Sequence, residues 1–63
     1  MIYNKIVKLC SDKGISIHFL ERTLGIGNGT IKGWTTNSPK LDLLMKVCDY
    51  FGITLDEMVR KEA

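Results

Sequence analysis

The chain has 63 residues, of which 44% are hydrophobic and 25% charged, with a net charge of +2. This length suits one small domain, and the apolar fraction is too high for a disordered chain of such low charge. No apolar run approaches the roughly 20 residues of a membrane span, and the start lacks the pattern of a secretory signal. We therefore expect one cytoplasmic domain over residues 1–63, with no membrane segment.

Few side chains are available for metal or redox chemistry. The chain has two cysteines, Cys10 and Cys48, and one histidine, His18. Both cysteines fall among apolar residues at helical spacing, which favours buried free thiols. With one histidine, no paired inward carboxylates and little chain to form a pocket, an enzyme is disfavoured. The sequence predicts no catalytic residue, no metal site, no cofactor and no small-molecule ligand.

Two helices are predicted in the first part of the chain. Residues 2–13 place their apolar side chains on one side, and Gly14 follows where a C-terminal glycine is expected. Ser16 provides an N-cap for a second helix over residues 17–24, which Gly25 ends. Both helices are short and have one apolar face each.

Two more helices are predicted in the last part of the chain. Ser38 followed by Pro39 is a typical helix start, with proline in the first helical position, and Gly52 ends that helix. Thr54, followed by two acidic residues, opens a last short helix. No stretch alternates for long enough to form a convincing strand. The predicted fold class is all-α, with five short helices once the middle of the chain is included.

The stretch LGIGNGTIKGW, residues 24–34, allows three interpretations. A phosphate-binding loop would need a strand before it, but a helix precedes it and the usual lysine–hydroxyl pair is absent. Asn28-Gly29 is a hairpin signal, yet the residues before it are too few for a strand. The third interpretation, a bend between two helices, agrees with both neighbours.

The apolar spacing around this bend is that of a helix-turn-helix motif. The inward positions, separated by a turn at Gly25, are Leu20, Leu24, Ile26, Ile31 and Trp34. Together with the segments IKGW and YFGITLDEMV, this pattern resembles the lambda-repressor-like family of the xenobiotic-response-element (XRE) type, and the resemblance covers nearly the whole chain. It implies a compact five-helix DNA-binding domain with the motif at the second and third helices. It also implies a transcriptional regulator, expected to be a repressor of bacterial, phage or mobile-element origin.

One position departs from the family pattern. The family usually has a small residue where this chain has Glu21. We expect Glu21 to lie at the edge of the motif or to pair with a base such as Arg22 or Lys32. Trp34 falls on the inward face, so it is predicted to be a core residue.

The second helix of such a motif enters the major groove of DNA. Its outward face is centred on Gly29, Lys32, Gly33 and Thr36, so two outward positions have no side chain. These glycines either let the backbone approach DNA or are tolerated in a short exposed helix. His18 either donates to DNA or is simply solvated. With the backbone contacts that the family pattern implies, the predicted DNA-binding residues are Ser16, His18, Gly27, Asn28, Gly29, Thr30, Lys32, Gly33, Thr36, Asn37 and Lys40.

The charge is distributed unevenly along the chain. Residues 13–40 carry four cationic side chains and one anionic one, a net charge of +3. Residues 41–63 carry three cationic and five anionic side chains, a net charge of −2. This favours an anionic partner for the middle segment, in agreement with double-stranded DNA. The alternative is a small helical interaction module, an antirepressor or adaptor on the same fold.

The apolar residues near the carboxyl terminus favour a homodimer. Several apolar residues crowd a very short helix there, and not all of them can reach the core of a small domain. The predicted dimer interface consists of Phe51, Leu55, Met58 and Val59. The competing interpretation is that these residues only cap the core.

Overall fold

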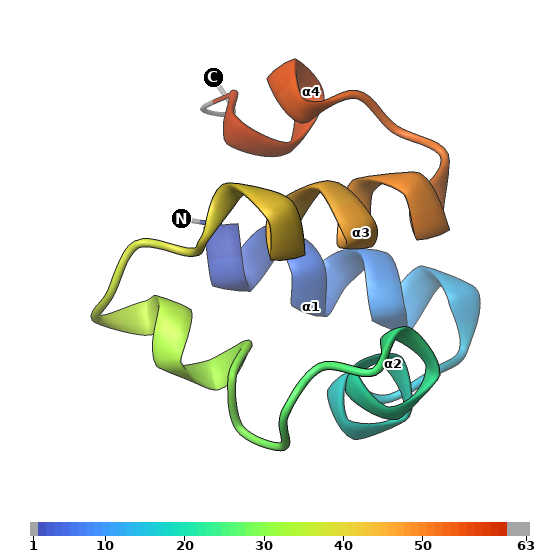
Figure 1. The fold of residues 1–63 in the computed structure, drawn as a ribbon. Helices are drawn as coiled ribbons and strands as arrows, with labels where there is room; N and C mark the ends of the chain where they lie inside the picture. Colours follow the sequence, from blue (N-terminus) through green and yellow to red (C-terminus); the bar gives the residue numbers. More distant parts are fainter. Residues whose placement is uncertain (1, 61–63) are drawn as a thin grey trace.

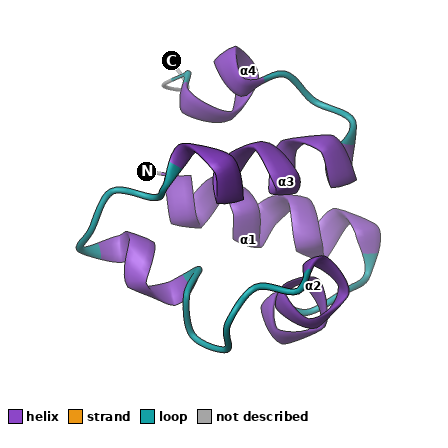
Figure 2. Ribbon diagram, in the orientation of Figure 1, coloured by secondary structure: helices purple, strands orange, loops and turns teal. Residues whose placement is uncertain are grey.

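The computed structural model describes residues 2–60. Its four α-helices are α1 (Ile2–Lys13), α2 (Ile17–Leu24), α3 (Leu41–Phe51) and α4 (Leu55–Val59), and a short 3₁₀ helix, η1, spans Lys32–Thr35. Only helices and loops occur in this part of the chain (Figure 2). The expected all-α class is therefore confirmed, but the five predicted helices are four α-helices and one 3₁₀ helix.

The helices α1 and α2 have the bounds that the sequence predicts, and their ends follow from local chemistry. The side chain of Ser16 accepts a hydrogen bond from the Phe19 amide at 3.0 Å, which caps α2 at its amino terminus. Gly25 ends α2 with φ +72°, a left-handed conformation that glycine adopts without steric cost. Its amide donates back to α2.

The segment between α2 and α3 differs from the expected regular helix. A turn over residues 27–30 is followed by η1, in which the Trp34 amide donates to the Ile31 carbonyl at 3.0 Å. Three glycines between residues 27 and 33 weaken an α-helix, and tighter 3₁₀ bonding of this kind is typical of short helical pieces. The second helix of the motif, which is the third helix predicted in the chain, is thus present in shortened form.

The predicted start of α3 at Ser38 and Pro39 is wrong. The helix begins at Leu41, and Lys40 occupies the N-cap position with extended backbone and no side-chain cap. Extended residues advance about 3.3 Å each, whereas helical residues rise 1.5 Å. Lys40 is extended, so the chain covers more distance at this residue than it would in a helix.

The short helix α4 is fixed at both ends. At its start, Thr54 and Glu57 form a capping box, with the Glu57 amide donating to the Thr54 hydroxyl at 3.1 Å. At its end, the Lys5 ammonium from α1 donates to the Glu57 carbonyl at 2.6 Å, where a cation complements the helix dipole. A five-residue helix has little stability alone, so these contacts hold α4 on the rest of the chain.

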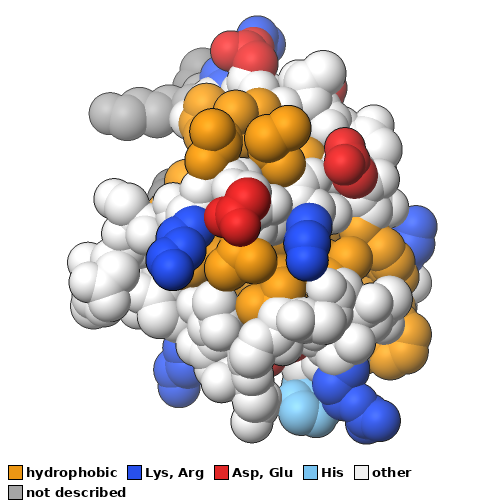
Figure 3. Space-filling model, viewed as in Figure 1, with side chains coloured by type: hydrophobic (Ala, Val, Ile, Leu, Met, Phe, Trp, Pro, Cys, Tyr) orange, Lys and Arg blue, Asp and Glu red, His pale blue; other side chains and the backbone are white. Residues whose placement is uncertain are grey.

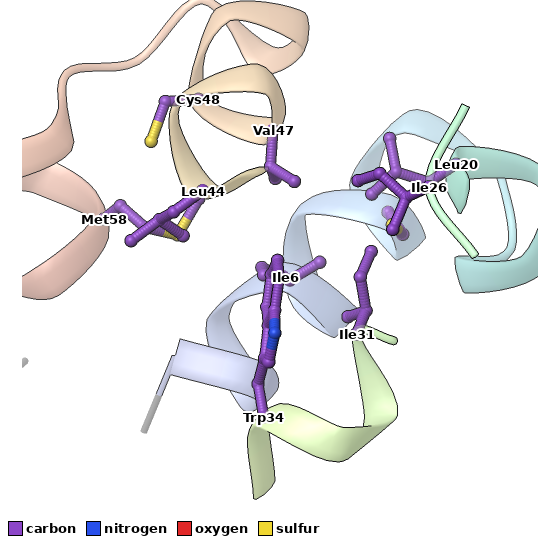
Figure 4. Close-up of a cluster of buried hydrophobic side chains, with 10 residues drawn as sticks. Ile6, Leu20, Ile26, Ile31, Trp34, Leu44, Val47, Cys48 and Met58 are labelled. Atoms are coloured by element: carbon purple, nitrogen blue, oxygen red, sulfur yellow. The ribbon is translucent and has the colours of Figure 1, made fainter. Parts of the chain in front are cut away.

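The helix α1 is the centre of the fold, since it packs against α2, η1 and α4. In Figure 1, α4 lies above α3, and the segment from α2 to η1 lies below it. Side chains from every helix point into one cluster (Figure 4). The fully enclosed members are Ile6, Leu20, Ile31, Val47 and Met58.

Trp34 lies in this core, as predicted, with 8% of its surface exposed. We expect Trp34→Ala to lower the free energy of unfolding by about 3–5 kcal/mol, since it removes a large buried side chain and leaves a cavity. Urea unfolding followed by circular dichroism measures the change. Thr35→Ala, an exposed position in the same segment, is the matched control and should change it by less than about 0.5 kcal/mol. A folded Trp34→Ala variant of unchanged stability would contradict this core assignment.

Candidate nucleic-acid interface

Residues 27–36, here called the reading segment, begin with a tight turn. The Thr30 amide donates to the Gly27 carbonyl at 3.1 Å, and Gly29, the third residue of this turn, has φ +86°. A positive φ at the third residue is what a type II turn requires, and it favours glycine. The Asn28-Gly29 pair therefore serves a turn between two helical segments and not a β-hairpin.

A carboxylate from α2 holds the start of the reading segment. The two oxygens of Glu21 accept hydrogen bonds from the Gly29 amide at 3.1 Å and from the Ile31 amide at 3.0 Å. Glu21 is 2% exposed. The expectation that it lies at the edge or pairs with Arg22 or Lys32 is wrong, because its partners are amides that lack an intrahelical acceptor.

The predicted contacts His18 and Asn28 meet across the turn. His18 Nδ1 lies 3.0 Å from Asn28 Oδ1, and both side chains belong to exposed residues. With Asn28 Oδ1 as the acceptor, His18 Nδ1 donates, and the Asn28 amide nitrogen keeps its two donors. His18 is therefore engaged with another predicted site residue rather than simply solvated.

A second group of predicted residues lines an open hollow of about 350 Å³ beside η1. Thr30, Gly33, Asn37 and Lys40 belong to it, together with Ser38, and Trp34 and Leu43 provide apolar surface. The hollow brings a hydroxyl, an amide and an ammonium group to one place. These groups donate hydrogen bonds and match the anionic oxygens of a phosphate.

The predicted residues Ser16, Lys32 and Thr36 lie outside these two groups. Each is exposed. Ser16 caps α2, and the Thr36 hydroxyl is 3.4 Å from the Gly33 carbonyl. None of the eleven predicted DNA-binding residues is buried, so all of them, including Gly27, are at the surface.

Acidic side chains are distributed unevenly on the molecule. On the face shown in Figure 3, the acidic side chains lie over α3 and α4, whereas Lys and Arg side chains lie both beside them and along the lower rim, towards the reading segment. This arrangement attracts an anionic polymer to the side that carries the reading segment.

The carboxyl-terminal residues divide between core and surface. Leu55 is 36% exposed and Val59 49%, whereas Met58 is 1% exposed and packs in the chain's own core. The prediction that Met58 forms a dimer interface is therefore wrong, because Met58 lies on the inward face of α4 and packs in the core. Phe51 is half-buried and contacts Tyr50 edge to face, with ring centroids 5.2 Å apart.

Both cysteines are buried free thiols. Burial raises the pKa of the Cys10 thiol, and burial together with the nearby Asp49 charge raises the pKa of the Cys48 thiol. A raised pKa keeps a thiol protonated and less nucleophilic. Within residues 2–60, no three potential ligand side chains gather as a metal site. In the same range no helix has the length and apolar character to cross a membrane.

Glu21 is the residue whose role was missed from the sequence. Its position gave one indication, because it directly follows the inward Leu20 on α2 and precedes a turn whose amides need acceptors. The acceptor for those amides could not be chosen from spacing alone.

The comparisons with known proteins agree with this geometry. Neither the curated proteins nor the solved structures give a match to the chain. A family model described as the Cro/C1-type HTH DNA-binding domain matches residues 5–62, which include α2, the turn and the reading segment. The chain therefore belongs to the Cro/C1-type helix-turn-helix DNA-binding domain family.

Proposed function

We propose that this protein is a repressor that binds a specific double-stranded DNA operator through the reading segment, in the cytoplasm of a bacterium or as part of a phage or mobile element. The observation that carries the proposal is the hollow beside η1, where Thr30, Asn37 and Lys40 present donor groups next to the turn that holds Asn28. Repression by occupying an operator needs no surface besides the one that binds DNA.

Two kinds of contact have different roles in this proposal. Asn28 reads a base edge, since an asparagine amide pairs with N6 and N7 of adenine, and His18 orients that amide through the 3.0 Å contact. Lys40 and Asn37 contact phosphates and fix the register of the protein on the duplex. Ser16 and the first amides of α2 form a second phosphate contact.

The alternative of an interaction module is less well supported. An adaptor that used the same face would present apolar side chains there. The outward residues Thr30, Lys32 and Thr36 are polar instead.

Selection of bound sites from random duplexes tests the proposal. We expect one enriched sequence, bound in fluorescence anisotropy with an affinity that falls steeply with salt. A promoter that overlaps the selected site should lose transcription in vitro when the protein is added. Failure to enrich any duplex, or affinity that does not change with salt, would refute the DNA-binding assignment.

The roles of Asn28 and Lys40 are separable by substitution. Asn28→Ala should relax the preference at one base pair by about 1–3 kcal/mol and leave the salt dependence unchanged. Lys40→Ala should weaken binding to all sequences alike and reduce the slope of log K against log salt by about 0.9. Anisotropy titrations over a salt series, on the selected site and on its single-base variants, measure both effects. A change of base preference in Lys40→Ala but not in Asn28→Ala would reverse the roles.

Gly33 tests whether the backbone approaches DNA closely. Its φ is not positive, and a Cβ there would meet no atom within 4 Å. Gly33→Ala should therefore stabilise the fold by about 0.4–1 kcal/mol while it weakens DNA binding, because the methyl group would stand between backbone and duplex. In the control Gly29→Ala, φ +86° makes any side chain strained, so the fold should lose stability. Unchanged DNA affinity in Gly33→Ala would mean that this glycine is only tolerated.

We also propose that the protein binds its operator as a homodimer. Leu55 and Val59 form the exposed face of α4, and Met45 on α3 is likewise 49% exposed. The apolar side chains over α3 and α4 are visible in Figure 3. Two copies would double the base contacts of a reading segment that offers few. Phe51 is half-buried, and we propose that its exposed part belongs to the same dimer surface.

A dimer predicts two half-sites about 34–36 Å apart, or a multiple of that distance, in a palindromic operator. Val59→Glu should abolish the two-protein complex on DNA, because it places a charge in an apolar contact. Sedimentation of each protein alone and on the operator fragment measures the stoichiometry. Val7→Glu, an apolar position on α1 that is 38% exposed, is the matched control and should still form it. One wild-type protein per duplex at saturation would contradict the dimer.

A further inference from the structure

We propose that Glu21 is a positioning residue for DNA recognition: its buried carboxylate selects the conformation of the reading segment that binds the operator. The inference rests on the proposed function and adds to it a residue that does not face DNA. Glu21 is 2% exposed, so any effect it has on DNA binding must pass through the residues it holds.

The contacts of Glu21 join three parts of the motif. Its carboxylate accepts from Gly29 and Ile31 at the start of the reading segment. Its backbone carbonyl accepts from the amide of Ile26, in the short link between α2 and the reading segment, at 2.8 Å. One residue of α2 thus fixes both the link at Ile26 and the reading segment that follows, while neighbouring Leu20 anchors α2 in the core with no exposed surface.

The reading segment needs such an external support. It contains Gly27, Gly29 and Gly33, and its regular part is a four-residue 3₁₀ helix. Glycine increases the conformational freedom of the free chain, and an isolated helix this short does not persist in water. The bonds from Glu21 therefore select one of many conformations that these residues could adopt.

The geometry also shows which acceptor the amides at the start of the reading segment bind. Helix amino termini commonly bind phosphate, but the Gly29 and Ile31 amides already donate to the Glu21 carboxylate. They are not available to a DNA phosphate in this conformation. Glu21 therefore acts by ordering the segment, and its loss should not remove a phosphate contact.

Glu21→Gln is the informative variant, since a Gln side chain has the same size but its amide nitrogen cannot accept from an N–H. It keeps one acceptor and loses the other. If the binding-competent conformation becomes about tenfold less populated, the apparent dissociation constant rises about tenfold. We expect at least this loss of operator affinity per folded molecule, with an unchanged slope of log K against log salt.

A core variant separates positioning from stability. Val47→Ala removes buried volume from α3 at a residue that has no exposed surface and lies outside the reading segment. We expect it to lower the melting temperature at least as much as Glu21→Gln does, yet to keep wild-type operator affinity per folded molecule. Circular dichroism gives the folded fraction of each protein under the conditions of the titration.

Hydrogen exchange by NMR gives a readout that does not depend on DNA. In Glu21→Gln, the Gly29 and Ile31 amides should exchange faster relative to the amides of α1, whereas Val47→Ala should leave that ratio unchanged. The inference is overturned if the Gln variant binds the operator like wild type per folded molecule, if the exchange ratio does not change, or if the variant does not fold at 10 °C. A wild-type protein that binds no duplex would instead refute the proposed function, and this inference with it.

Discussion

The arrangement of the motif depends on one buried carboxylate, that of Glu21. A carboxylate removed from water is costly unless strong hydrogen bonds replace its hydration. Here the Gly29 and Ile31 amides provide them, and the same bonds satisfy two amides that have no helical acceptor. The hydrogen bonds thus offset the cost of desolvation for both the carboxylate and the amides. The negative charge of the carboxylate also lies at the positive end of a helical segment, where it is favourable. Charge-assisted hydrogen bonds thus join α2 to the reading segment.

This constraint explains how a segment poor in side chains can be ordered. Ile31 and Trp34 hold the inner side of the reading segment in the core, and Glu21 holds its start. The outer side is then left to short polar groups and to bare backbone at Gly33. The DNA contact proposed for this outer side relies on a few side chains, of which Asn28 lies 3.0 Å from His18.

The carboxyl-terminal helix α4 is held in place by different contacts. The helix α4 is too short to be stable alone, and a capping box, a lysine from α1 and the burial of Met58 fix it in place. Because Met58 fills the core, Leu55 and Val59 remain on the outside. The acidic side chains of α3 and α4 lie over the upper and middle parts of the face in Figure 3, beside Lys and Arg side chains.

The sequence by itself determined the all-α class, the bounds of α1 and α2, the inward positions of the motif and the burial of Trp34. These features depend on periodicity and on caps, which act between residues a few positions apart. Tertiary structure alone decided the partners of Glu21, the start of α3 at Leu41 and the burial of Met58. In each case a local rule allowed more than one outcome. The outcome depended on which groups lay opposite one another once the helices had packed around α1.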